Sequence, residues 1–182
     1  NYENKIYKWI CERLIYYIDT IEPSNRVIIA FDGVAPVAKL EQQRNRRYKT
    51  WYVNDYLNQF TNEKKEMWDT TAITPGSEFM KNLGNYINSY FTDKYPKLKI
   101  IISSSNEIGE GEHKIYDYIR NNKEHHFDTN TVIYGLDADL IFLSLGTHLN
   151  NIFLLREDQQ FRNVVKDTEI KQPFCYLQID YP

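Results

Sequence analysis

The sequence is poor in the features that hold small secreted proteins together and in those that anchor membrane proteins. It has only two cysteines, Cys11 and Cys175, far apart and without CxxC spacing, so neither a zinc site nor a disulfide framework is indicated. Its apolar runs are far too short to span a bilayer, and its N-terminus has no signal-peptide pattern. We therefore expect an intracellular protein in a reducing compartment, and we favour the cytoplasm over the nucleus.

A large excess of one charge sign is also lacking. The net charge of −3, the isoelectric point near 5.8 and the hydrophobic share of 42% are those of an ordinary globular protein. A local basic patch could still bind phosphate, because the whole-chain sum hides clustering. The chain has no obvious Ser-His-Asp or Cys-His set, no internal repeat and no low-complexity linker. Its 182 residues suit one core, so we predict a single domain over residues 1–182.

Apolar runs and helical spacing alternate along the chain. Four short runs rich in Ile, Val, Leu and Phe predict buried strands: residues 26–31, 98–103, 131–136 and 151–156. Apolar residues at threes and fours predict helices in residues 6–21 and 79–90 and from about 111 to 119, and residues 140–145 suit a further helix. Residues 35–56 are taken as a helix in which Pro36 occupies the first turn. This alternation predicts right-handed βαβ units and an α/β fold, a mostly parallel central sheet flanked by helices.

Acidic residues follow three of the predicted strands. Asp32 comes directly after the first, Glu110 and Glu112 follow the second, and Asp137 and Asp139 follow the third. Because parallel strands end at one edge of a sheet, these five acids could converge there. Clustered carboxylates repel one another unless a cation neutralises them. Two divalent ions, Mg²⁺ or Mn²⁺, would neutralise these carboxylates and would support hydrolysis of a phosphodiester.

Each acid also has a purely structural interpretation. A single Asp after a strand is commonly a turn former or a helix N-cap, and Asp139 suits that role. Glu110 and Glu112 could favour a helix start through the helix dipole. Acids at three separate strand ends shift the interpretation toward a metal site for phosphoryl chemistry.

The predicted helix after Asp32 carries a basic stripe. Four residues fall at i, i+4, i+7 and i+8, on one face of that helix: Lys39, Gln43, Arg46 and Arg47. Arg44 and Lys49 are expected to point elsewhere. Such a stripe is commonly a solvated helix face. Beside an acidic metal site it could instead hold a terminal phosphate, and a pocket fitted to a monophosphate would make the protein an exonuclease.

Five motifs carry a family resemblance: FDGVAPVAKLEQQRNRR, ITPGSEFM, GEGEHKIYDYIR, YGLDADLIFLSL and LLRE. They occur in the order found in the XRN family of 5′→3′ exoribonucleases, which the chain resembles from its first helix to the closing FCYLQI. The resemblance implies a PIN-like, flap-nuclease-related fold that degrades single-stranded RNA bearing a 5′-monophosphate, one nucleotide at a time, with divalent metal. By motif, the metal ligands would be Asp32, Glu110, Glu112, Asp137 and Asp139. By motif, the 5′-phosphate pocket would be Lys39, Gln43, Arg46 and Arg47.

The chain also departs from the family pattern. Val37 stands where the family has Arg, and Ile108 stands where it has Pro. Further metal-binding Asp residues, one ahead of the first helix and one in a GNDF-like motif downstream, have no counterpart in this sequence. We therefore expect a fragment or a truncated relative. Two alternatives stay open: a catalytically incomplete metal- or RNA-binding remnant, and a DNA-directed flap-nuclease relative, against which QQRNRR and GEGEHKI argue.

Several further residues allow two interpretations each. His113 could support the acids or pack at the start of a helix. Trp51, Tyr52 and Tyr56 could stack on bases, although packing in a core or between helices is the safer interpretation. Lys114 is expected to neutralise the acids.

Overall fold

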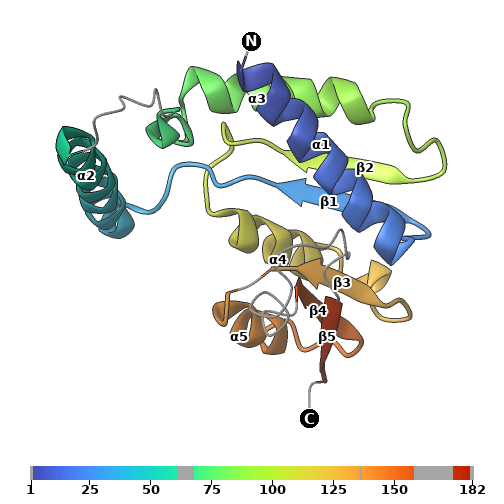
Figure 1. The fold of residues 1–182 in the computed structure, drawn as a ribbon. Helices are drawn as coiled ribbons and strands as arrows, with labels where there is room; N and C mark the ends of the chain where they lie inside the picture. The colour runs from blue at the N-terminus through green and yellow to red at the C-terminus, as the bar shows by residue number, and fades with distance from the viewer. Residues whose placement is uncertain (1, 61–67, 136, 158–173, 181–182) are drawn as a thin grey trace. The chain divides into compact units, whose positions relative to one another are not determined.

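The computed structural model describes residues 2–60, 68–135, 137–157 and 174–180. It divides into two compact units, Asn1–Lys114 and Ile115–Pro182, and the boundary falls within a helix, α4 (Gly111–Asn121). Each unit has its own sheet and its own hydrophobic core. Helices and strands alternate along the chain, so the α/β prediction is confirmed (Figure 1). That both units belong to one domain stays a prediction.

Two parallel strands form the sheet of the first unit. β1 (Arg26–Ala30) pairs with β2 (Lys99–Ser103) in register along five residue pairs. Phe31 continues the pairing, because its N–H donates to the Ser103 carbonyl at 2.9 Å. The segments that follow β1 and β2 therefore leave the sheet at the same edge.

Two helices and the sheet enclose the core of this unit. α1 (Tyr2–Ile21) and α3 (Glu78–Phe91) contribute most of the buried side chains: Tyr7, Cys11, Ile18, Phe79, Met80, Leu83, Ile87 and Phe91. The Ser77 hydroxyl accepts from the Met80 N–H at 3.2 Å and caps α3. Burial raises the pKa of the Cys11 thiol to about 11, so this cysteine serves packing and stays protonated at neutral pH.

A close contact between two loops closes the edge where β1 and β2 end. The Gly33 N–H donates to the Gly109 carbonyl at 2.8 Å, and the Gly109 N–H donates to the Val34 carbonyl at 3.2 Å. A Cβ atom on Gly33 would lie 1.7 Å from the Glu107 carbonyl oxygen. Only glycine lets the two loops approach this closely.

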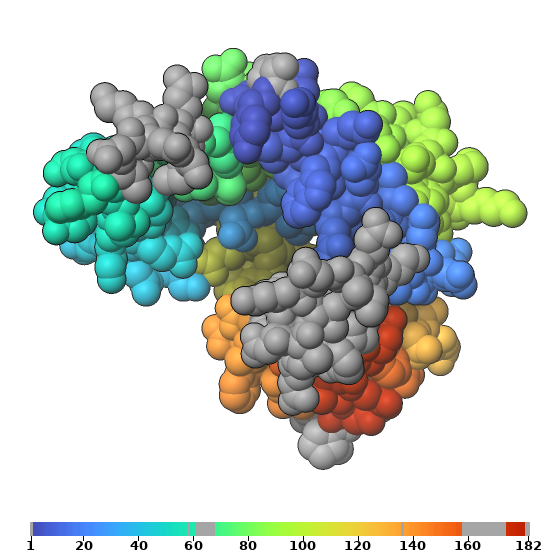
Figure 2. Space-filling model, in the orientation of Figure 1, coloured from blue at the N-terminus to red at the C-terminus, as the bar shows by residue number. Residues whose placement is uncertain are grey.

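A long, mostly exposed helix follows this loop. α2 (Val37–Phe60) is light blue to turquoise at the surface of the first unit (Figure 2). Its Trp51, Tyr52 and Tyr56 are 57%, 65% and 51% exposed, so the prediction that they pack in a core or against a helix is wrong for the described residues. After α2, the described chain resumes at Trp68 and forms a short helix, η1 (Thr70–Ala72).

The second unit has a mixed sheet. β3 (Thr131–Tyr134) pairs in parallel with β4 (Ile152–Glu157), and β4 pairs antiparallel with β5 (Phe174–Ile179). α4 and α5 (Asp139–Leu145) pack on a core that includes Tyr116. A short helix, η2 (Lys123–His125), lies between α4 and β3.

The predicted strands and helices are largely confirmed. All four predicted strands form, and β1–β2 and β3–β4 pair in parallel, in two separate sheets. β1 and β2 are mostly half-buried and not fully buried, because each is an edge strand of a two-stranded sheet. β5 lies where the sequence pattern predicts no element. No helix of the described residues has the length and apolar character needed to cross a membrane.

A glycine pair tests the loop contact. We expect Gly33→Ala to lower the urea midpoint of unfolding, because its Cβ would overlap the Glu107 carbonyl oxygen. Gly84→Ala, in α3, is the matched control, because its Cβ would meet only Ser104 Cβ at 3.6 Å. Removing a helical glycine stabilises by about 0.5–1 kcal/mol, so this variant should unfold at an equal or higher midpoint. Equal midpoints for Gly33→Ala and the unmodified chain would contradict the described packing.

Candidate active site

One hydrogen bond links Asp32 to the start of α4, at the sheet edge of the first unit. Asp32 follows β1, and its Oδ1 accepts from the Gly111 N–H, at the start of α4, at 2.6 Å. A Cβ on Gly111 would lie 3.0 Å from the Ala30 carbonyl oxygen and 3.2 Å from Asp32 Oδ1. Because Gly111 stands between Glu110 and Glu112, this bond ties Asp32 to the backbone between the two glutamates. Asp32 itself is not a member of the group of possible ligand atoms that these glutamates form with His113.

The residues around Gly111 form a group that could hold a metal ion. Ligand atoms of Glu110, Glu112 and His113 all lie within 4.8 Å of one another. His113 Nε2 lies 3.7 Å from Glu110 Oε2 and 3.9 Å from Glu112 Oε1. Carboxylate oxygens suit a hard divalent ion, and one imidazole nitrogen is compatible with Mn²⁺ as well as with softer metals. The donor set therefore fits the predicted Mg²⁺ or Mn²⁺.

His113 is a candidate ligand that the sequence interpretation did not include. The sequence pattern indicates only a supporting or packing role for His113. Its position in GEGEH, three residues after Glu110 and therefore about one helical turn along, is the signal that could have placed it beside that glutamate.

Lys114 forms its hydrogen bonds with backbone carbonyl groups, whereas the sequence led us to expect it to neutralise the acids. Its ammonium donates to the Phe31 carbonyl at 2.9 Å and to the Ser104 carbonyl at 2.8 Å, so it joins the segments that follow β1 and β2. Burial lowers the pKa of Lys114, and the charges of Glu107 and Asp32 oppose that shift. Its direct partners are two carbonyl groups, and the acids act on it through their charge.

Asp137 and Asp139 lie in the second unit, after β3. Both are exposed, and the Asp139 N–H donates to Asp137 Oδ1 at 3.0 Å. Asp139 is the first residue of α5, and Ala138 occupies the N-cap position without a side-chain hydrogen bond. The alternative N-cap role for Asp139 is therefore wrong, because Asp139 lies inside the helix and the side chain that accepts the backbone N–H is that of Asp137.

The basic stripe on α2 begins at the acidic group. Lys39 Nζ lies 2.8 Å from Glu110 Oε2, and the Lys39 side chain is half exposed while that of Glu110 is 13% exposed. This contact lies within the first unit and joins α2 to the start of α4. Lys39 therefore lies beside an acidic residue, as expected from the sequence.

Gln43 and Arg47 lie further along α2 and interact with each other. Arg47 Nη2 donates to Gln43 Oε1 at 3.4 Å, and Arg47 Nη1 donates to the Thr74 hydroxyl at 3.5 Å. Arg46 is exposed. Of the four predicted phosphate-binding residues, Lys39 contacts Glu110, Gln43 and Arg47 contact each other, and Arg46 faces solvent.

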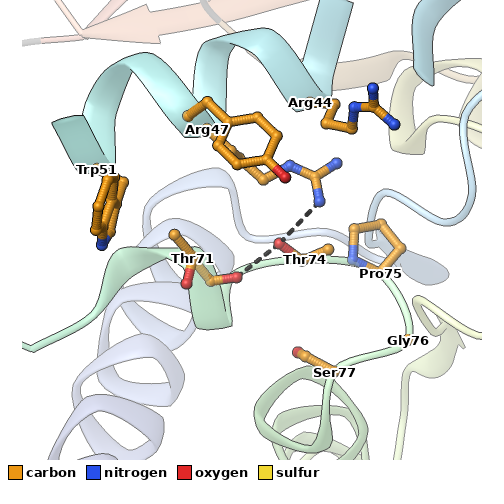
Figure 3. A pocket seen from close by; sticks show the side chains of 9 residues that line it. Arg44, Arg47, Trp51, Thr71, Thr74, Pro75, Gly76 and Ser77 are labelled. Carbon is orange, nitrogen blue, oxygen red and sulfur yellow. Dashed lines mark hydrogen bonds between the residues drawn. The ribbon is translucent and has the colours of Figure 1, made fainter. Parts of the chain in front are cut away.

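A cavity of about 710 Å³ lies between α2 and the segment before α3 (Figure 3). Its lining comprises Arg44, Arg47, Tyr48, Trp51, Thr71, Thr74, Pro75, Gly76 and Ser77. Arg44 was expected to point away from the stripe, and it lines this cavity together with one residue of the stripe, Arg47. The two side chains share this cavity, because residues three apart are neighbours on a helix surface.

Comparison with known proteins identifies relatives over most of the chain. A family model described as "XRN 5'-3' exonuclease N-terminus" matches residues 1–158. The chain is 39% identical to "5'-3' exoribonuclease 1" of Saccharomyces cerevisiae, over 97% of this chain and 13% of that protein. It is 37% identical to "5'-3' exoribonuclease 2" of Candida glabrata, over 89% of this chain and 20% of that protein. The chain thus spans a fifth or less of these two relatives.

Glutamate substitutions test the metal group. We expect Glu112→Gln to weaken Mn²⁺ binding to the full chain by about tenfold or more, measured by isothermal titration calorimetry, because a carboxylate ligand is lost. Glu107→Gln is the matched control. Its carboxylate accepts from the Ser103 hydroxyl at 2.6 Å and is not a member of the group, so Mn²⁺ affinity should change less than about twofold. Equal losses in the two variants would reject the assignment.

Proposed function

Because the chain belongs to the family of XRN 5′-3′ exonucleases, we propose that it carries the catalytic centre of a 5′→3′ exoribonuclease acting on RNA with a 5′-monophosphate. One observation carries the proposal: the contact of Lys39 with Glu110, at 2.8 Å, joins a basic helix to an acidic group. A phosphate held on α2 would then lie next to the group that could bind metal. Two relatives that are named exoribonucleases support RNA over DNA as the substrate.

The proposed fold is PIN-like and related to that of flap nucleases. The parallel pairing of β1 with β2 and of β3 with β4, with helices between the strands, supports it. The proposed metal ligands are the five acids of the motifs: Asp32, Glu110, Glu112, Asp137 and Asp139. Asp137 and Asp139 are assigned on the motif YGLDADL alone, and His113 is added as a further candidate ligand from its place in the group.

Divalent ions bound by these acids would lower the pKa of a water molecule and neutralise the charge of the scissile phosphate. The residues of the chain do the remaining work. The Asp32–Gly111 hydrogen bond holds the backbone between Glu110 and Glu112 at the sheet edge, where their carboxylates would bind a cation. Lys39, already beside Glu110, supplies a positive charge for the RNA phosphate nearest the acids.

The proposed grip on the 5′-phosphate explains the direction of cleavage. Arg46 and Arg47 offer paired N–H donors to the terminal phosphate, and Gln43 offers an amide. Water attacks the phosphorus that links the first two nucleotides, and the bond from that phosphorus to the first 3′-oxygen breaks, with a proton going to this oxygen. The remaining RNA thereby gains a new 5′-monophosphate. Each cut recreates the end that the helix recognises, which supports successive removal of nucleotides.

Arg46 and Lys49 offer a matched pair for testing the phosphate grip. Both are exposed cations on α2, and only Arg46 belongs to the predicted stripe. Hydrogen bonds to charged groups contribute about 1.5–3 kcal/mol, so Arg46→Ala should lower kcat/KM for 5′-monophosphate RNA by about 10–100-fold. For 5′-hydroxyl RNA, kcat/KM should stay nearly unchanged. Lys49→Ala should keep the preference for the 5′-phosphate, and a preference equally lost in both variants would refute the grip.

Asp137 provides a test of catalysis in the second unit. We expect Asp137→Asn to slow Mg²⁺-dependent degradation of 5′-monophosphate RNA by about 100-fold, because a proposed metal ligand is neutralised. Asp128→Asn, an exposed acid outside the motifs, is the control and should degrade RNA at the unmodified rate. Circular dichroism should show both variants folded. An unchanged rate in a folded Asp137→Asn variant would remove Asp137 from the catalytic set.

A further inference from the structure

The cavity between α2 and residues 71–77 has a basic lining. Arg44 and Arg47 reach it from α2, and its nine lining residues include no Asp or Glu (Figure 3). The hydrogen bond from Arg47 Nη1 to the Thr74 hydroxyl, at 3.5 Å, orients one guanidinium toward the loop side. Guanidinium groups match phosphate oxygens through paired N–H donors. The charge of the cavity therefore favours an anionic ligand.

Two aromatic rings from α2 complete the lining. Tyr48 is 64% exposed and Trp51 is 57% exposed. They stand three residues apart on the same helix face as Arg44 and Arg47. Exposed rings beside cations are the combination with which proteins bind single-stranded nucleic acid, because any base can stack on a ring while the cation holds the backbone.

We infer that this cavity is a subsite for one nucleotide of single-stranded RNA, with the base on Trp51 or Tyr48 and the phosphate at Arg44. Its volume of about 710 Å³ lies within the range of small-ligand pockets. The inference rests on the proposed function for the choice of RNA over DNA. It shares Arg47 with the 5′-phosphate grip, whereas Arg44, Tyr48 and Trp51 are not among the residues assigned to that grip.

Arg47 connects the subsite to the proposed 5′-phosphate stripe. It donates to Gln43 on one side and to Thr74 on the other. A nucleotide in the cavity would therefore neighbour the stripe and be held whatever the chemistry of the 5′ end. The subsite would raise the affinity for single-stranded RNA in general, whereas the stripe would select the 5′-monophosphate.

Binding without cleavage tests this subsite. The full chain is titrated, in EDTA, into a short 5′-hydroxyl oligouridylate labelled with fluorescein at its 3′ end, and the Kd is measured by fluorescence anisotropy. Trp51→Ala and Arg44→Gln should each weaken binding by about tenfold. Trp51→Phe keeps a ring and should stay within about threefold of the unmodified chain. Arg44→Gln should also lower the salt dependence of binding by about one phosphate contact.

Two matched controls lie on the same helix. Tyr52→Ala removes an exposed ring and Lys49→Gln removes a cation, and neither residue lines the cavity. Both variants should bind within about twofold of the unmodified chain. Equal losses in the controls and in the Trp51 and Arg44 variants would overturn the subsite, because they would indicate general attraction to α2.

Other outcomes also decide the question. The subsite is wrong if the unmodified chain does not bind the 5′-hydroxyl RNA, or if Trp51→Ala binds it normally. A lower melting temperature of Trp51→Ala with unchanged RNA affinity would mean that protein covers the cavity, and would likewise overturn it. The proposed function is tested separately, by RNA cleavage and by the preference for a 5′-phosphate. It can stand while the subsite fails, and RNA affinity can depend on Trp51 in a chain that does not cleave.

Discussion

The hydrogen bond from the Gly111 N–H to Asp32 Oδ1, at 2.6 Å, is the contact on which the candidate active site depends. It joins the residue that follows β1 to the first residue of α4. It can form because the strands pair in parallel and because Gly33 and Gly111 have no Cβ at the two closest approaches. Lys114 reinforces this edge by donating hydrogen bonds to two carbonyl groups, those of Phe31 and Ser104.

Side-chain contacts of Lys39 and of Arg47 attach α2 to the rest of the first unit. Lys39 meets Glu110 at the start of the helix, and Arg47 meets Thr74 about two turns later. The first contact brings basic residues next to the acids, and the second forms one wall of the cavity. The same helix thus presents one face toward a proposed metal centre and a neighbouring face toward a proposed nucleotide subsite. A single element with two such faces suits a protein that holds an RNA end while following its chain.

Local sequence patterns predicted the helices and strands well. Short apolar runs marked β1 to β4, and the rule that parallel strands end at one edge led to Asp32 and Glu110. β5 escaped prediction because its place depends on antiparallel pairing with β4, which is remote in sequence. The cavity beside Arg44 was not predicted, because a helical stripe shows which residues are neighbours but not which loop faces them. The meeting of Asp137 and Asp139 with the other acids stays a prediction from their motif.

The central claim is that an acidic metal centre and a phosphate-binding helix act together to remove nucleotides from the 5′ end. Product analysis tests it most directly: the full chain is incubated with Mg²⁺ and single-stranded RNA that carries a labelled 5′-monophosphate. The account predicts that the label appears from the earliest times as a nucleoside 5′-monophosphate, with no labelled fragment of intermediate length. Labelled internal fragments, or a label that stays on long RNA while its 3′ end shortens, would contradict the account.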